Sequence, residues 1–327
     1  MDTPVGTPKR LSRWSRDPEL SESGKAKAAY LVERDIEIFK LLARFTYLPL
    51  DDIHAYVGGS EVNLGRRASL LSRKPNVYLN RPHQQRLADA NYRRLIYELD
   101  DRGRAVLAEL GLPQLPKRCH RNFVHELMAC RIMLSFELGA RAQTHVRLIQ
   151  WSEIVTKLPQ ATLNLEQPNH IPVAITMHGE CHNLNIAADW RPFGVERQAD
   201  GKSFYCFFPG IEADTGTEPI EAGAYRSDIH RKLVAYLEVC NARIYQSHFG
   251  FPQHGFFVPF ITGSRNRMEN MMELLRKLTD GKGHPSFLFK TFPPLTSFEK
   301  PPAPSGRMLT EAWARVGSSP LNLIERR

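Results

Sequence analysis

Acidic side chains end two apolar segments in the second half of this 327-residue sequence. Asp189 ends the run 186–189, and Glu212 and Asp214 end the longer run 204–214. Acids at the ends of neighbouring strands can approach one cation, and alternate residues such as Glu212 and Asp214 share a strand face. Such oxygen ligands suit Mg²⁺ or Mn²⁺, which beside a phosphodiester would orient water and stabilise developing charge. Ordinary strand-end acids that cap turns are the alternative.

Positive charge is concentrated in one short stretch of the first half. The chain carries 44 Lys and Arg against 35 Asp and Glu, a net charge of +9. Residues 62–94 hold eight of these basic residues and a single acid, Asp89. Such a cluster favours a polyanionic partner. A solvated basic face without a partner is the alternative.

The segments around this charge follow the order helix, helix, helix and β-hairpin. Apolar residues recur at helical spacing over 31–43, a second helix runs over 51–57, and Ser60 is a good N-cap for a third. Strand-like segments follow at 77–79 and 95–99, and a helix over 101–110 closes the series. This order is typical of a winged helix-turn-helix. Its third helix enters the major groove, while its hairpin, the wing, lies along backbone or minor groove.

The winged-helix interpretation selects residues expected to contact duplex DNA. They lie on the third helix, directly after it, and on the hairpin: Asn63, Arg66, Arg67, Arg73, Lys74, Arg81, Arg86, Arg93 and Arg94. Arginine suits contacts with bases or phosphates because its guanidinium donates hydrogen bonds in a fork. A winged helix that contacts protein is the alternative.

The second part of the chain alternates helices and strands. We expect helices over 122–140, 225–249 and 266–279. The expected strands cover 146–151, 173–177, 184–188, 204–211, 255–262 and 286–291. This order predicts a mixed α/β domain with one central sheet.

Composition and these elements predict five segments along the chain. They are a flexible basic tail over 1–28, a winged-helix domain over 29–112, a linker over 113–120, an α/β domain over 121–291 and a proline-rich extension over 292–327. No apolar run is long enough for a membrane helix, and the N-terminus lacks the apolar core of a secretory signal. Five scattered cysteines indicate a reducing compartment. We therefore expect a cytoplasmic location and no membrane partner.

Several short segments of the chain, taken in their order along the sequence, resemble the replication-relaxation family of plasmid and mobile-element proteins. The similarity spans residues 30–290, in short pieces at 34–45, 97–107, 125–137, 210–219 and 232–236. The resemblance implies a role in plasmid replication and DNA relaxation. It also implies an N-terminal winged helix and a restriction-endonuclease-like C-terminal domain similar to the PD-(D/E)xK nucleases.

The resemblance also assigns candidate catalytic residues, Asp189, Glu212 and Lys232. The nuclease pattern has Pro-Asp on one strand and Asp/Glu-x-Lys on the next. Asp189 fills the first position without its proline, Glu212 opens the second, and Asp214 stands where the lysine belongs. Lys232 on the following helix is positioned to supply the missing cation. An active site would use Mg²⁺ or Mn²⁺ held by Asp189, Glu212 and Asp214.

These observations together predict a DNA-binding accessory protein of a plasmid or integrated mobile element. It would dock on double-stranded DNA through the winged helix and keep a degenerate nuclease-like domain. One alternative is an active metal-dependent nuclease or nickase. A second alternative is a scaffold that recruits a relaxase or a replication initiator. A second copy of the chain, in a homodimer, is a further candidate partner.

Overall fold

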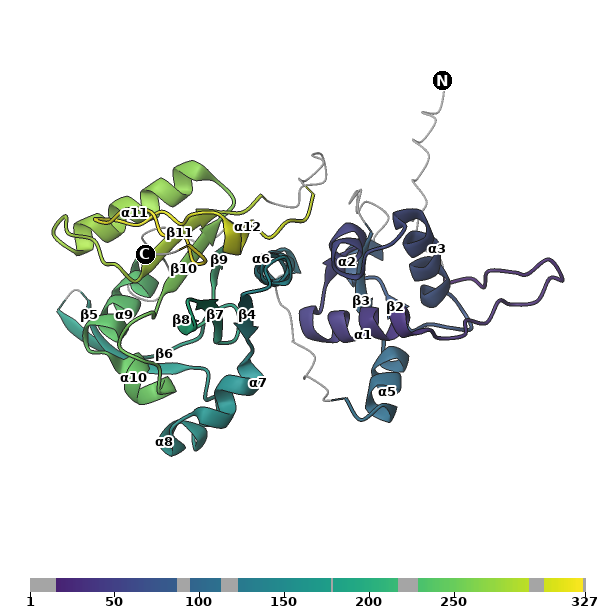
Figure 1. The fold of residues 1–327 in the computed structure, drawn as a ribbon, viewed down its shortest axis with the longest axis horizontal. Helices are drawn as coiled ribbons and strands as arrows, with labels where there is room; N and C mark the ends of the chain where they lie inside the picture. The colour runs from purple at the N-terminus through teal and green to yellow at the C-terminus, as the bar shows by residue number, and fades with distance from the viewer. Residues whose placement is uncertain are drawn as a thin grey trace, which may run out of the picture. The chain divides into compact units, whose positions relative to one another are not determined.

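The computed structural model describes six stretches of the chain. They are residues 16–86, 95–112, 123–177, 179–216, 229–293 and 303–325. Contacts divide the chain into two compact units, Met1–Arg131 with Leu295–Pro304 and Ile132–Pro294 with Ser305–Arg327. Each unit has a hydrophobic cluster of its own, and Figure 1 colours the chain from purple to yellow through both. The fold is mixed α/β, as the sequence predicts.

Helices form most of the first unit. α1 (Glu33–Phe45), α2 (Leu50–Val57) and α3 (Glu61–Ser72) follow one another, and α5 (Asp101–Glu109) comes later in the chain. α1 packs inward because its apolar residues recur every three or four positions. The apolar residues that it buries are Ile38, Phe39, Leu41, Leu42 and Phe45.

A small antiparallel sheet completes the first unit. β1 (Leu48–Pro49), β2 (Leu79–Asn80) and β3 (Ile96–Leu99) pair in the order β1-β3-β2. β3 is the central strand, and all four of its residues are buried. A single-turn helix, α4 (His83–Arg86), lies between β2 and β3 in the sequence. The third helix is therefore followed by two paired strands that return antiparallel to each other.

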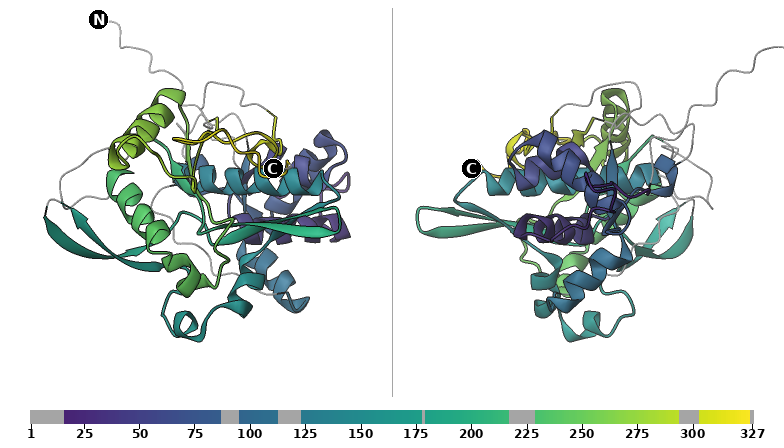
Figure 2. Two further views of the ribbon diagram at one scale, coloured as in Figure 1. Left: turned by 60° about the vertical axis from the view of Figure 1, so that its left-hand side comes forward. Right: turned by 90° about the vertical axis from the view of Figure 1, so that its right-hand side faces the viewer.

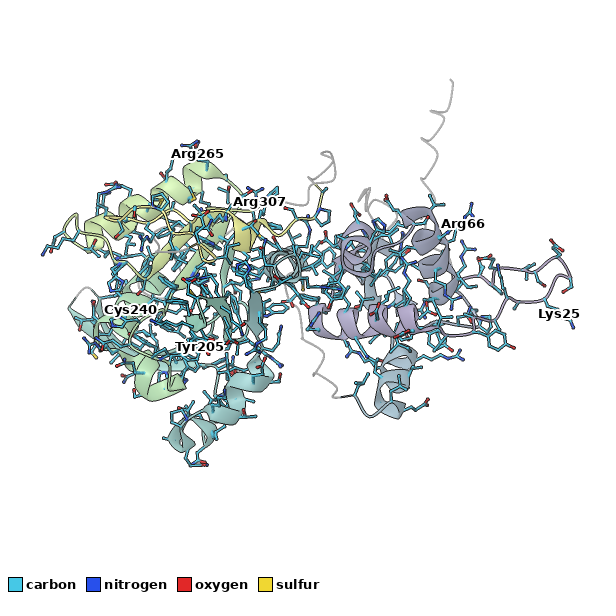
Figure 3. The ribbon with its side chains drawn as sticks, viewed as in Figure 1. Lys25, Arg66, Tyr205, Cys240, Arg265 and Arg307 are labelled. Carbon is cyan, nitrogen blue, oxygen red and sulfur yellow. The ribbon has the colours of Figure 1, made fainter. Side chains whose placement is uncertain are left out.

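Residues 16–28 differ from the flexible tail that composition suggests. A β-bridge between Leu20 and Ala26 closes them into a loop, whose Lys25 is labelled in Figure 3. Arg16 fixes the start of the loop, since its guanidinium donates to Asn80 at 2.7 Å and pairs with Asp100 at 3.0 Å. Local composition could not reveal these partners, which are distant in the sequence.

The boundary between the two units falls inside a helix. α6 (Phe123–Arg141) is continuous, and the division lies between Arg131 and Ile132. The linker expected over 113–120 lies outside the described residues. In the first unit, Phe123 and Leu127 of α6 pack with Tyr47 and Ile96. The expected domain start near residue 121 therefore lies about three helical turns before the observed boundary.

Two three-stranded sheets form the centre of the second unit. β4 (Val146–Ile149), β7 (Phe193–Ala199) and β8 (Lys202–Phe208) are antiparallel in the order β4-β7-β8. The second sheet is parallel, in the order β11-β10-β9. Its strands are β9 (Glu212–Asp214), β10 (Val258–Thr262) and β11 (Phe287–Thr291).

A parallel bridge between Phe207 and Phe256 connects β8 with the segment that precedes β10. A separate hairpin, β5 (Ile171–Met177) with β6 (Glu180–Ile186), appears in teal in Figure 2 as a two-stranded ribbon. The one central sheet expected from the sequence is thus divided into smaller sheets.

Helices pack against these strands. α9 (Ile229–Asn241), α10 (Ile244–Phe249) and α11 (Arg265–Leu278) are the longer ones that lie wholly in the second unit. The single helix expected over 225–249 is divided, because Arg243 adopts a left-handed conformation with φ of 54°. Its expected start, 225–228, lies outside the described residues.

Three short helices and an irregular C-terminal segment complete the second unit. α7 (Trp151–Ile154) and α8 (Gln160–Leu163) follow β4, and α12 (Arg307–Thr310) opens the C-terminal segment. This segment is fixed by the fully buried Trp313. Across the described ranges, no helix combines the length and hydropathy needed to cross a bilayer.

Candidate functional site

Asp189 lies beside β9 and not at the end of a strand. β6 ends at Ile186, and Asp189 falls in the connection that leads to β7. Its backbone N–H donates to the carbonyl of Ile211 at 2.9 Å, and its Oδ2 accepts from the N–H of Ala213 at 2.8 Å. These two hydrogen bonds involve the residues on either side of Glu212. Asp189 is therefore held next to Glu212 by hydrogen bonds with backbone atoms.

Gly210 makes this close approach possible. It lies between β8 and β9 with φ of 141°, a conformation that side-chain-bearing residues rarely adopt. A Cβ at this position would lie 2.1 Å from the carbonyl oxygen of Trp190 and 2.5 Å from the Cβ of Ala188. Any larger residue would therefore displace the connection that carries Asp189.

Glu212 is buried between two side chains of α9. Its side chain is 3% exposed, and Oε1 accepts from the hydroxyl of Tyr236 at 2.7 Å. The ammonium of Lys232 lies 3.0 Å from Oε2, although no well-aligned hydrogen bond reaches that buried oxygen. Lys232 and Tyr236 are four residues apart, so they project from one face of α9. The helix thus presents a cation and a hydroxyl to a single carboxylate.

Burial and the Lys232 ammonium shift the pKa of Glu212 in opposite directions. Burial raises the pKa of Glu212 to about 7, because the carboxylate loses its hydration. The Lys232 ammonium opposes this rise, whereas the charge of Asp189 adds to it. Burial and the Glu212 charge also raise the pKa of Tyr236 well above its usual range, so its hydroxyl stays a hydrogen-bond donor. The two carboxylates therefore affect each other electrostatically, although they are on different segments.

Asp214 has a different environment. The Arg267 guanidinium binds both of its oxygens, with Nη2 2.8 Å from Oδ1 and Nε on Oδ2. Thr262 donates to Oδ2 at 2.9 Å, and the N–H of Gly216 donates to Oδ1 at 3.1 Å. Because four donors occupy this carboxylate, the expectation that Asp214 is a metal ligand is wrong for this conformation. Within the described ranges, no three His, Cys, Asp or Glu side chains gather around one point as a metal would require.

The candidate DNA-contact residues of the first unit separate into exposed and engaged side chains. Asn63, Arg66 and Lys74 are exposed, and Figure 3 shows Arg66 on α3. Arg67 instead crosses to α1, where its Nε donates to Oδ1 of Asp35 at 2.9 Å. Asp35 is 1% exposed, so Arg67 neutralises a buried charge. Arg67 therefore braces α3 against α1, although sequence spacing suggested that it faced outward.

Two other arginines are also less exposed than a DNA contact would require. Arg73 is half-buried at the C-cap of α3. Arg81, expected on an exposed wing, is 6% exposed and contacts Tyr97 of β3. The wing assignment of Arg81 is therefore wrong in this structure, because its guanidinium is enclosed by the sheet. The Arg86 side chain and the whole of Arg93 and Arg94 lie outside the described residues.

Sequence reasoning missed three residues that shape the surroundings of Glu212 and Asp214. Tyr236 was not selected as a site residue, although its spacing from Lys232 was a usable signal. Arg267 carried no signal, because its partner Asp214 is 53 residues away. Gly210 could have been noticed as a glycine that interrupts an apolar strand, which often marks a close backbone approach.

Comparisons of this chain with family models, curated proteins and solved structures found no match. The resemblance to the replication-relaxation family therefore stays a prediction from the sequence.

Proposed function

We propose that this protein binds duplex DNA through the first unit, as an accessory protein in replication or relaxation of a plasmid or mobile element. The observation that carries the proposal is the exposed face of α3, which presents Asn63 and Arg66, with Lys74 just beyond the helix. The order of the helices and the β1-β3-β2 sheet fit a winged helix, in which the third helix reads the major groove.

The engaged arginines refine this interface. Arg67 is paired with Asp35, and Arg81 is buried against the sheet. Among the described residues, Asn63, Arg66 and Lys74 are therefore the exposed candidates for contacts with bases or phosphates. Arg66 is the strongest candidate because its guanidinium can donate two hydrogen bonds to guanine or to a phosphate. Arg67 supports docking indirectly, by holding α3 on α1.

The test is duplex binding by fluorescence anisotropy at several salt concentrations. Arg66→Ala should weaken binding and reduce the slope of log K against log salt by about 1, because one phosphate-neutralising charge is lost. Arg276→Ala on α11 is a matched control that removes an exposed arginine from the second unit. Unchanged affinity and slope in Arg66→Ala would overturn the assignment of α3 as the docking helix.

A second candidate function is metal-dependent cleavage of DNA by the second unit. The specific observation in its favour is the cluster of Asp189, Glu212 and Lys232, because these three residue types recur in PD-(D/E)xK nucleases. Lys232 could supply the positive charge of the motif lysine, whose place in the sequence is taken by Asp214. The raised pKa of Glu212 also suits a carboxylate that loses a proton when a cation binds.

The residues present fit a hard divalent cation. Oε2 of Glu212 faces the Lys232 ammonium at 3.0 Å, which a bound cation would displace, and Asp189 lies alongside. Mg²⁺ is commonly held by one or two carboxylates together with water and substrate phosphate. When bound, such an ion would stabilise negative charge that develops on a phosphodiester. Lys232 would then neutralise Glu212 or the phosphate, and Tyr236 would orient the Glu212 carboxylate.

Supercoiled plasmid incubated with Mg²⁺ or Mn²⁺ tests this second function. We expect nicking that is lost in Asp189→Asn and Glu212→Gln and retained in Arg276→Ala. Intact supercoils at high protein concentration, or nicking that persists in both acid variants, would leave DNA binding as the function of this chain.

A further inference from the structure

The second unit contains a cavity that neither proposed function uses. Its volume is about 520 Å³, within the range of small-molecule sites. It lies between β8, the segment before β10 and the C-terminal residues around 321–325. Arg197 of β7 lies opposite Phe204 of β8. The other end of this strand pair, where Phe193 lies opposite Phe208, is the end that leads to Asp189 and Glu212. The cavity is therefore separate from Asp189 and Glu212.

A buried arginine lines this cavity. Arg197 is 9% exposed, and its guanidinium stacks over the ring of Phe204 at 4.5 Å. Within the part of the chain that the structure describes, it makes no hydrogen bond or ion pair. Its nitrogens are not among the enclosed unpartnered atoms of the described residues, so they keep access to solvent and face the water of the cavity. Arg197 thus provides donors for an anion that enters the cavity.

The rest of the lining limits the kind of anion. Apolar side chains line one part of the space, where Phe257, Leu321 and Leu323 are buried and Phe204 is 47% exposed. Ser203, His254 and Asn322 add polar groups. Two acids, Asp200 and Glu325, are exposed at its edge. One buried positive charge balances one carboxylate. A phosphate monoester carries roughly −1.5 to −2 charges at pH 7, which is more than one guanidinium neutralises.

We propose that this cavity binds an apolar monocarboxylate. The carboxylate accepts a bidentate pair of hydrogen bonds from Arg197, in the geometry that a guanidinium fork favours. The apolar body of the ligand packs against Phe204, Phe257 and the two leucines. The ligand is either a small aromatic or aliphatic acid, or the C-terminal carboxylate of a peptide with an apolar last residue.

Calorimetric titration of the full chain with phenylacetate tests the proposal. Phenylacetamide has the same shape without the charge, and we expect it to bind at least about tenfold more weakly. Benzyl phosphate should also bind more weakly than phenylacetate. A tripeptide that ends in phenylalanine, compared with its C-terminal amide, distinguishes a peptide ligand from a free acid.

Variants locate the binding site. Arg197→Gln should reduce affinity for phenylacetate about tenfold or more, whereas Arg147→Gln, an exposed arginine on β4, should leave it unchanged. Because Arg197 has no acidic partner to strand, its replacement should not unfold the unit. Glu325→Gln removes a repelling charge at the exposed edge and should strengthen binding by roughly two- to threefold.

Three outcomes would overturn the proposal. They are no saturation by phenylacetate up to about 10 mM, equal affinity for phenylacetate and phenylacetamide, and unchanged affinity in Arg197→Gln. If Arg197→Gln does not fold, the comparison of acid with amide in the wild type and the sign of the Glu325→Gln effect decide the question.

Discussion

The ammonium of Lys232 lies 3.0 Å from Oε2 of Glu212, while Oε1 of the same carboxylate accepts from Tyr236. Glu212 is thus positioned by two residues of one helix. The negative charge of Asp189, in the connection between β6 and β7, also acts on Glu212. This arrangement links the stability of the second unit to the cluster that could bind a cation.

Removal of Lys232 should destabilise the second unit. In Lys232→Met the buried carboxylate loses its cation, and breaking such a pair costs about 3 kcal/mol. Chemical denaturation, monitored by tryptophan fluorescence, measures the loss. Lys277→Met, on an exposed position of α11, is the control and should change stability by less than about 0.5 kcal/mol. Equal effects of the two substitutions would mean that the Glu212–Lys232 contact contributes nothing.

Asp214 should matter for stability and not for cation binding. Asp214→Asn leaves Arg267 with a neutral partner and should cost about 2–3 kcal/mol in unfolding free energy. Mn²⁺ titration followed by electron paramagnetic resonance should give the wild-type affinity for this variant and a large loss for Asp189→Asn. Loss of Mn²⁺ binding in folded Asp214→Asn would restore Asp214 as a ligand.

Arg67 and Arg66 are adjacent but should respond differently to substitution. Arg67→Met strands the carboxylate of Asp35, which is 1% exposed, and should destabilise the first unit by about 2–3 kcal/mol. Arg66→Met should change stability by less than about 0.5 kcal/mol, because Arg66 is exposed. Urea denaturation compares the two variants. A larger loss of stability in Arg66→Met than in Arg67→Met would contradict the brace between α3 and α1.

Lys290 should make stability depend on alkaline pH. It lies on β11, is 6% exposed, and donates at 2.7 Å to the carbonyls of both Arg307 and Glu311. Burial lowers its pKa from 10.5 to about 8, so between these values the unfolded chain binds more protons than the folded chain. The Lys290 contribution to the unfolding free energy should therefore rise as pH increases through this window.

The measurement is the wild-type unfolding free energy minus that of Lys290→Met, at pH values from about 6 to 10. We expect a constant difference below pH 8 and an increase in favour of the wild type above it. A difference that stays flat across the whole range would show that Lys290 keeps its ordinary pKa.

Local pattern predicts several elements of this fold closely. The segment expected as a helix over 101–110 is α5, Asp101–Glu109, and the strand expected over 95–99 is β3, Ile96–Leu99. Such elements are readable because their apolar residues repeat at the period of the structure that buries them. β7 was missed, because Glu196, Arg197 and Gln198 interrupt its apolar pattern. It exists because β4 and β8 pair with it on both edges.

The sequence by itself determined the mixed α/β class, the concentration of positive charge around the third helix, and the residue types of the acid cluster. Only the tertiary structure decided which charged side chains are available to bind DNA or a cation. Arg67 is taken by Asp35, Asp214 by Arg267, and Lys232 turns to Glu212, in pairs that are 20 to 53 residues apart. The physical reason is that a charge enclosed on folding must find a partner. That partner is set by which elements pack together and not by spacing along the chain.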